Sequence, residues 1–278
     1  MLKKGIGQSL VFFILFIVVM IMLFKANALY GLAFILFSLV AFCIIKRAAI
    51  FAFLGRTSYY KGDMEKGLRW FKKAYKSGSA KPQTITSYAY LLLKTAKIQE
   101  AEDILESLLR TKLEANDRMM VRSNMALVQW KKGNLDEAIQ TLEEVITSYE
   151  TTNIYGSLGY ILIQKGDLDK ALEFNLKASD YNSTNTIIMD NLGQTYYLRG
   201  EYDKAVEIYE NLMDSNPSFP EAYYNYALVL KEKNEIEKAL ETARKSLNYS
   251  LSFLSTIVKE DIDNLIKDLE EIAISNQG

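Results

Sequence analysis

One nine-residue string recurs in this chain, and its spacing restricts the fold more than any other feature. It reads WKKGNLDEA at residues 130–138, IQKGDLDKA at 163–171 and YLRGEYDKA at 197–205. Self-similarity at a fixed period of roughly 20–50 residues is typical of repeat proteins, in which each repeat contacts only its neighbours. The chain is therefore expected to build a stack of similar units.

The centre of the string is typical of a turn between two helices. Glycine at this point supplies the left-handed backbone that ends a helix. A small residue follows five positions later and another precedes the turn by seven or eight, which lets two helices cross closely. Each repeat therefore predicts a helix–turn–helix unit. Six positions share the turn, 33 to 37 residues apart: Gly62, Ala96, Gly133, Gly166, Gly200 and Asn234.

Charged residues around the turn favour the same interpretation. A basic residue stands before most turns, at the negative end of the first helix dipole, and acidic residues follow near the positive end of the second. Asp63, Asn134 and Asp167 are the expected N-caps of second helices. We interpret these carboxylates as structural. The basic set is Lys61, Lys132, Lys165, Arg199 and Lys233, and the acidic set is Glu65, Asp136, Asp169, Asp203 and Glu237.

The pattern resembles the tetratricopeptide repeat. The fifth copy matches it most fully, with Leu192-Gly193, Tyr196, Gly200, Tyr202, Ala205, Tyr209 and Pro217. The resemblance covers about residues 48–253 and implies an all-α fold, a right-handed α-solenoid of six helix pairs. The second repeat departs most, with Ala96-Lys97 where Gly-Asp is expected, and three extra residues precede the third. The expected repeats are 48–81, 82–115, 119–151, 152–185, 186–219 and 220–253.

Residues 254–278 are expected to close the stack as a capping helix and tail. An array of helix pairs leaves an apolar face open at its end and needs a cap. Apolar residues recur at helical spacing along residues 257–272, which predicts one amphipathic helix. They are Ile257, Ile262, Leu265, Ile266, Leu269 and Ile272.

Two long apolar runs precede the repeats. Residues 5–24 and 28–45 contain no charge, and about twenty helical residues cross the hydrocarbon core of a bilayer. Residues 25–27 between them predict the turn of a transmembrane hairpin over residues 1–47. Basic residues flank both outer ends, so the positive-inside rule predicts a two-span protein of the cell membrane with cytoplasmic repeats. These flanking residues are Lys3, Lys4, Lys46, Arg47 and Arg56.

A cleaved signal sequence is the alternative for the first run. Lys3-Lys4, an apolar stretch and the sequence ANA at residues 26–28 resemble its three parts. The length of the run and the second run directly after it favour the hairpin. No proline occurs between Lys46 and Tyr60, and Gly55 already belongs to the repeat pattern. The second span is therefore expected to continue into the first repeat helix.

Composition argues against most catalytic chemistry. The 278 residues include no histidine and one cysteine, Cys43. That removes His-assisted nucleophiles, intrachain disulfides and the usual zinc sites. The chain has 33 Lys and Arg against 34 Asp and Glu, but the first 62 residues hold no acidic residue. The repeats are therefore acidic and unsuited to nucleic acid. We expect no enzyme activity, no cofactor and no metal.

The resemblance also implies a peptide-binding groove. In the family, the concave face is lined mainly by the first helix of each pair and binds an extended or helical peptide. Asn124, Asn191 and Asn225 share a position where the family often uses Asn to hydrogen-bond a ligand backbone, and aromatic residues add rigid contact area. Packing between helices, or bonding to a neighbour, is the alternative for each residue. The expected groove residues are Tyr60, Tyr90, Asn124, Trp130, Asn153, Tyr160, Asn191, Gln194, Tyr197, Tyr224 and Asn225.

These features predict a non-catalytic scaffold that binds a partner protein or peptide at the cytoplasmic face of a membrane. The groove lacks the Lys/Arg set with which some members clamp a carboxylate terminus, so a mixed polar–apolar peptide is expected. The layout is similar to bacterial anchored repeat proteins that assemble or regulate membrane or envelope processes. The alternative is a subunit of an integral membrane complex, with specificity in the hairpin and the repeats as an oligomerisation arm. A homo-oligomer is compatible with both.

Overall fold

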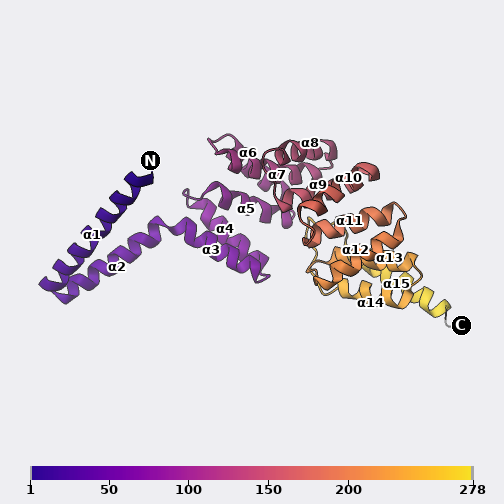
Figure 1. Ribbon diagram of the computed structural model, residues 1–278. Coiled ribbons are helices and arrows are strands. Elements are labelled where there is room, and N and C mark those ends of the chain that lie inside the picture. Colours follow the sequence, from indigo (N-terminus) through magenta and orange to yellow (C-terminus); the bar gives the residue numbers. More distant parts are fainter. Residues whose placement is uncertain (1, 277–278) are drawn as a thin grey trace. The chain divides into compact units, whose positions relative to one another are not determined.

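The computed structural model describes residues 2–276, and in that range it holds fifteen helices and no strand. The all-α architecture expected from the repeats is confirmed. The chain divides into two compact units, Met1–Thr84 and Ile85–Gly278. Figure 1 labels the helices of both units along the chain.

The first unit begins with two helices joined by a single residue. Asn27 separates them and caps the second, because its Oδ1 accepts the Leu29 N–H at 2.8 Å. The two helices pack on each other, with the rings of Phe16 and Phe34 5.2 Å apart. The predicted helical hairpin is therefore present. The helices of this unit are α1 (Leu2–Ala26), α2 (Ala28–Ile45), α3 (Arg47–Tyr60) and α4 (Met64–Lys76).

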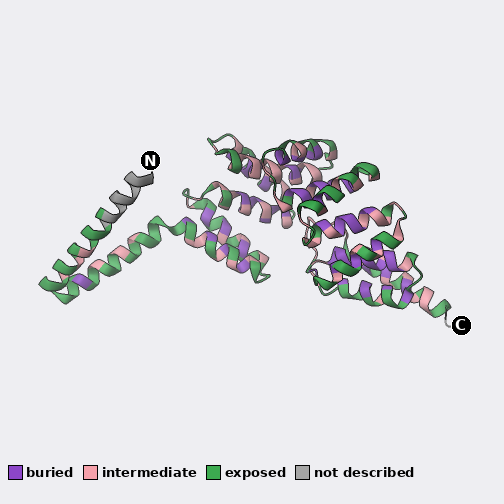
Figure 2. Cartoon of the chain, in the orientation of Figure 1, coloured by how far each residue is buried: buried purple, intermediate pink, exposed green. Residues whose placement is uncertain are grey.

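The side chains of α2 are largely uncovered by protein. Gly31 is its only buried residue, and Figure 2 shows the helix mostly in the colour of exposed residues. Among the described residues, α2 alone is long and apolar enough to cross a membrane, while Phe13–Ala26 is a shorter apolar stretch. The start of the predicted first span, residues 5–10, lies outside the described side chains. Within the described residues, length and composition thus support the second of the two predicted spans.

The junction of α2 and α3 corrects an expectation from the sequence. Lys46, with φ −95° and ψ 10°, ends one helix and precedes the next, so the predicted continuous helix is broken there. Backbone hydrogen bonds still bridge the break. The Lys46 N–H donates to the Phe42 carbonyl at 2.8 Å, and the Ile50 N–H donates to the Lys46 carbonyl at 3.0 Å. The two helices are therefore joined by one hydrogen-bonded residue.

The second unit continues the helix pairs as an α-solenoid. Each second helix packs on the first helix of the next pair, as α8 does on α9. First helices also contact one another, α7 on α9, α9 on α11 and α11 on α13. The helices are α5 (Pro82–Lys94), which starts just before the unit boundary, α6 (Ile98–Leu109), α7 (Ala115–Lys131), α8 (Leu135–Ile146), α9 (Thr152–Lys165), α10 (Leu168–Tyr181), α11 (Thr186–Leu198), α12 (Tyr202–Asp214), α13 (Pro220–Glu232), α14 (Ile236–Ser246) and α15 (Lys259–Ser275).

The turns and close crossings follow the sequence pattern. All six predicted turn residues have positive φ, between 60° and 87°. A Cβ added to Gly193 would lie 2.7 Å from the Tyr209 ring, so the small residue there is required by the helix crossing. Asp63 and Asp167 cap their helices through Oδ1, at 2.9 and 3.1 Å. Asn134 occupies the N-cap position, but its side chain makes no capping hydrogen bond.

The last helix covers the end of the second unit. Ile262, Leu265 and Leu269 of α15 are buried, and the helix packs on α14 and α13. Leu265 and Leu269 share one core cluster with Tyr209 and Ala243. The apolar stripe read from the sequence is therefore the buried face of α15, except for Ile257, which precedes the helix.

Candidate functional site

The structure places ten of the predicted groove residues on first helices of the second unit. We call the surface that these helices form the first-helix face. Tyr90 lies on α5, Asn124 and Trp130 on α7, Asn153 and Tyr160 on α9, Asn191, Gln194 and Tyr197 on α11, and Tyr224 and Asn225 on α13. Asn191 and Asn225 are buried, Asn153 is exposed, and the other seven are half-buried. Tyr60, on α3, belongs to the first unit.

The three asparagines at the shared position use their amide N–H groups inside the chain. Asn191 is 2% exposed and donates to the Gly156 carbonyl at 2.8 Å. Asn225 is 3% exposed and donates to Asp190 Oδ1 at 3.1 Å. Asn124 donates to the Met120 carbonyl of its own helix at 2.9 Å. Asn191 and Asn225 therefore tie one first helix to the preceding one and offer almost no surface to a ligand in this structure.

A buried carboxyl group lies beneath the first-helix face. Asp190 is 6% exposed, and its Oδ1 accepts hydrogen bonds from Asn225 and, at 3.1 Å, from the Tyr209 hydroxyl. Burial raises the pKa of Asp190 to about 7, and the charge of Glu221 adds to this, while the two donors act in the opposite direction. Asp190 therefore titrates near neutral pH in the folded chain.

Aromatic rings and one lysine form a cluster on α7 and α9. Trp130 and Tyr160 meet edge to face, with ring centroids 5.3 Å apart. The Lys131 ammonium lies 4.5 Å from the centroid of Trp130 and 4.6 Å from that of Phe253. Such cation–π contacts strengthen when the cation is desolvated, and burial lowers the pKa of Lys131. Burial likewise raises the pKa of Tyr160 above its usual value.

Phe253 belongs to residues 249–258 (YSLSFLSTIV), which we call the connecting segment because it joins α14 to α15. Its Phe253 N–H donates to the Lys94 carbonyl at 3.1 Å. The Thr256 N–H donates to Glu221 Oε1 at 3.3 Å, and the Thr256 side chain lies near the Tyr160 hydroxyl. Residues 251–257 are half-buried without a break. The connecting segment therefore lies against α5, α7, α9 and α13.

The start of the connecting segment is held by a pair of tyrosines. The rings of Tyr223 and Tyr249 stack with centroids 5.1 Å apart, and their hydroxyl oxygens are 3.1 Å from each other. Tyr223 also donates to the Pro217 carbonyl at 3.0 Å. Sequence analysis did not identify this segment. The available signal was ten successive uncharged residues in a chain that is 24% charged.

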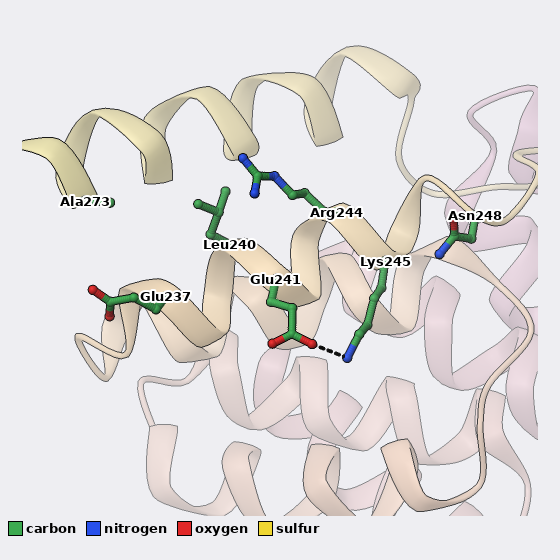
Figure 3. A pocket seen from close by; sticks show the side chains of 7 residues that line it. All are labelled: Glu237, Leu240, Glu241, Arg244, Lys245, Asn248 and Ala273. Carbon is green, nitrogen blue, oxygen red and sulfur yellow. Dashed lines mark ion pairs between the residues drawn. The ribbon is translucent and has the colours of Figure 1, made fainter.

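A shallow depression between α14 and α15 is a weaker candidate. Figure 3 shows its lining, which is largely charged. Lys245 pairs with Glu241 at 2.8 Å, and Arg244 pairs with Glu270 at 2.6 Å. These side chains satisfy one another at the surface, as on many solvated helices. Within residues 2–276, no group of three or more metal-ligating side chains is placed to hold an ion.

Comparison with known families identifies the repeats. Family models described as tetratricopeptide or TPR repeats match residues 123–182, 193–234 and 220–252. These ranges cover the second half of α7, all of α8–α10, the end of α11 and all of α12–α14, so the repeats recognised in the sequence are confirmed there. Tetratricopeptide repeats form a protein-interaction fold, and this chain carries that fold.

Solved structures show the same fold at low sequence identity. The chain is similar to Pseudomonas aeruginosa pilF, with 16% identity over 73% of this chain and 91% of that chain, and a TM-score of 0.55. It is also similar to a chain of the APC/C hetero-tetramer Cut9–Hcn1, with 15% identity and a TM-score of 0.64. That match covers 80% of this chain and 42% of the other. At such identities the likeness concerns the fold alone.

Proposed function

We propose that this chain is a non-catalytic scaffold, attached to a membrane, which binds an extended segment of a partner protein on its first-helix face. The observation that carries the proposal is the row of half-buried, uncharged side chains along that face. Trp130, Tyr160, Gln194, Tyr197 and Tyr224 combine apolar area with hydrogen-bonding groups. Aromatic side chains of this kind dominate the binding energy of protein interfaces.

The membrane part of the proposal rests on α1 and α2. Large apolar side chains of α2 are uncovered, among them Leu29 and Phe37, each 71% exposed. Continuous apolar surface of this extent requires lipid or another protein. Basic residues at both outer ends of the hairpin favour a cytoplasmic position for the repeats. A role in assembling or regulating a membrane or envelope process fits this arrangement.

Cross-linking capture from membranes tests the binding face. We expect a Tyr197→Ser/Tyr224→Ser variant to lose the protein that the parent chain captures, since it loses two aromatic contacts on the first-helix face. Tyr181→Ser is the matched control, because Tyr181 lies on the second helix α10 and is 43% exposed. Circular dichroism verifies that all variants are folded. Unchanged capture by the double variant would contradict the proposed face.

The alternative function places specificity in the hairpin. It is favoured by the exposed apolar surface of α2, which could equally pack on helices of a membrane complex, with the repeats as an oligomerisation arm. A chain that starts at residue 47 separates the two functions. Capture by this truncated chain supports the first-helix face, whereas loss of capture together with retained folding supports the hairpin.

A further inference from the structure

The connecting segment is longer than the connection of two packed helices requires. Twelve residues separate Ser246, the end of α14, from Lys259, the start of α15, although these helices pack on each other. Connections between packed helices usually take about 2–8 residues. The additional chain extends to Lys94 on α5 and Lys131 on α7, which lie four and three helix pairs before α13, respectively. Its course follows the first-helix face.

The contacts of the connecting segment have the form of peptide recognition. Two main-chain N–H groups of the segment donate hydrogen bonds to the repeats: that of Phe253 to the Lys94 carbonyl, and that of Thr256 to the Glu221 carboxylate. Main-chain bonds of this kind hold a peptide whatever its sequence, and side-chain contacts select among sequences. The segment turns at this point, because the Ser255 N–H donates to the Ser252 carbonyl at 2.9 Å. Here the Lys131 ammonium contacts the Phe253 ring and the Tyr160 hydroxyl lies near the Thr256 side chain. The segment carries no charge, as a half-buried position on an aromatic surface requires.

We infer that residues 249–258 are a built-in ligand of the first-helix face, which a partner displaces with an uncharged segment that turns at the same place and carries an aromatic residue three positions before a serine or threonine. This inference rests on the proposed function and specifies its partner. The aromatic residue takes the place of Phe253 beside Lys131. The hydroxyl takes the place of the Thr256 side chain near Tyr160, while the main-chain N–H of the same residue donates to Glu221.

The tethered segment weakens partner binding by competition. The segment is tethered to α14 at one end and to α15 at the other, and a short tether gives an effective concentration of about 1 mM. If the segment itself has an intrinsic Kd near 100 μM for the face, it weakens the binding of any competing partner peptide by about tenfold. Release of the segment removes that factor without any change in the binding surface.

Hydrogen exchange on the full chain tests the docking without any partner. We expect slow exchange of the Phe253 and Thr256 amides in the parent chain. A Phe253→Ala/Thr256→Val variant loses the ring and hydroxyl contacts, and its segment amides are expected to exchange at least tenfold faster. Val258→Ala is the matched control, since Val258 is an exposed apolar residue of the same segment. Fast exchange in the parent chain overturns the inference.

Binding of a labelled synthetic peptide of residues 248–258 tests the competition. We expect fluorescence anisotropy to report about tenfold tighter binding to the Phe253→Ala/Thr256→Val chain than to the parent. Adding Tyr160→Phe to that variant is expected to weaken the peptide again, because the hydroxyl contact to Thr256 is lost. If the amides are protected but the peptide does not bind the released chain, the segment is only a structural brace and the inference is wrong.

The two tests separate this inference from the proposed function. Neither uses the natural partner, so both can succeed or fail independently of capture from membranes. If capture depends on Tyr197 and Tyr224 but the peptide does not bind, the proposed scaffold function stands and the inference of a built-in ligand is wrong. If the peptide binds but capture does not depend on Tyr197 and Tyr224, the segment is a ligand of the face and the proposed partner-binding function is wrong.

Discussion

At the residue scale, the turns are the positions that sequence and structure describe most alike. Two of the six left-handed turn residues are not glycine: Ala96 has φ 60° and Asn234 has φ 60°. Asparagine tolerates this conformation, whereas alanine meets a clash between Cβ and the following carbonyl. The repeat pattern located Ala96 at the turn because the flanking small residues kept their spacing. Alanine there is a strained departure from the pattern.

Ala96→Gly is therefore expected to stabilise the chain. The left-handed conformation costs an L-residue roughly 1–2 kcal/mol, and the extra chain entropy of glycine offsets part of this gain. We expect a net increase of about 0.5–1 kcal/mol in the free energy of unfolding, measured by denaturant titration in mild detergent. Ala101→Gly is the control, because Ala101 is buried in α6 and glycine should destabilise it by about 1 kcal/mol. Equal effects at both positions would contradict the strain at Ala96.

Asp190 gives the chain a pH dependence of stability. Its pKa is raised from 3.8 to about 7 in the folded state, so folding favours the protonated form. Its contribution to the free energy of unfolding is fully present below pH 3.8, decreases as the pH rises and is lost above pH 7. Each unit of difference between the folded and unfolded pKa corresponds to about 1.4 kcal/mol. Glu221, Tyr209 and Asn225 are the polar groups that act on it.

Asp190→Asn removes this titration while keeping an oxygen that can accept from Tyr209 and Asn225. We expect the melting temperature of the variant to vary less between pH 5 and pH 8 than that of the parent. The stability of the variant relative to the parent is expected to increase as the pH rises. Thermal melts monitored by circular dichroism measure this. Parallel pH profiles for the two chains would show that Asp190 does not titrate in this range.

The asparagines show where residue-level prediction stopped. Their shared place in the repeat was readable from the period, but the group that each amide meets was not. Asn191 and Asn225 each bond to an atom 35 residues earlier, on the preceding first helix. Each bond depends on how closely the two helices approach; for Asn191 the acceptor is the carbonyl of Gly156, where a Cβ would lie 3.1 Å from Ile187 of the next first helix. One-sequence periodicity contains no such information.

At the element scale, ion pairs connect successive repeats. The basic residue before a turn was expected to meet only the dipole of its own helix. In the structure it also reaches an acidic residue about thirty positions earlier, in the second helix of the preceding pair. The pairs are Lys132–Glu102 at 2.8 Å, Lys165–Asp136 at 2.6 Å, Arg199–Asp169, and Lys233–Asp203 at 2.5 Å.

A double-mutant cycle on Lys165 and Asp136 measures one of these pairs. Both side chains are substantially exposed, so we expect a coupling of only about 0.2–1 kcal/mol. Screening should abolish most of it near 1 M salt. Denaturant titration of the parent, Lys165→Ala, Asp136→Ala and double variants gives the value. A larger coupling that is insensitive to salt would mean that the pair is desolvated and orders the repeats more strongly than its exposure indicates.

Prediction of elements from the sequence succeeded where the period is regular. The fold of each pair follows from local turn chemistry and small residues, both readable from 34-residue spacing. The connecting segment could not be predicted because it has no period. Its contacts to Lys94 and Glu221 join residues more than 30 positions apart. The uncharged run indicates partial burial, but only the three-dimensional course of the repeats determines what covers it.

At the scale of the whole molecule, we expect the hairpin to determine whether the chain resides in a membrane. Deletion of residues 1–46 is expected to release the protein from membranes into the soluble fraction after an alkaline wash, since it removes the apolar surface of α1 and α2. Deletion of residues 1–26 is the control, because α2 remains and is long enough to cross a bilayer alone. The shorter deletion should stay in the membrane pellet. A soluble protein in both cases would place the anchor in α1.

The single residue between α2 and α3 has a mechanical consequence. Lys46 leaves the polypeptide two rotatable backbone angles at this joint, and hydrogen bonds on both sides restrict them further. No flexible linker separates α2 from α3, so a rotation of α2 is transmitted to α3. If α2 lies in a bilayer, a change in its tilt should therefore reorient α3. A change in membrane thickness or tension would then exert a force on the first helix pair.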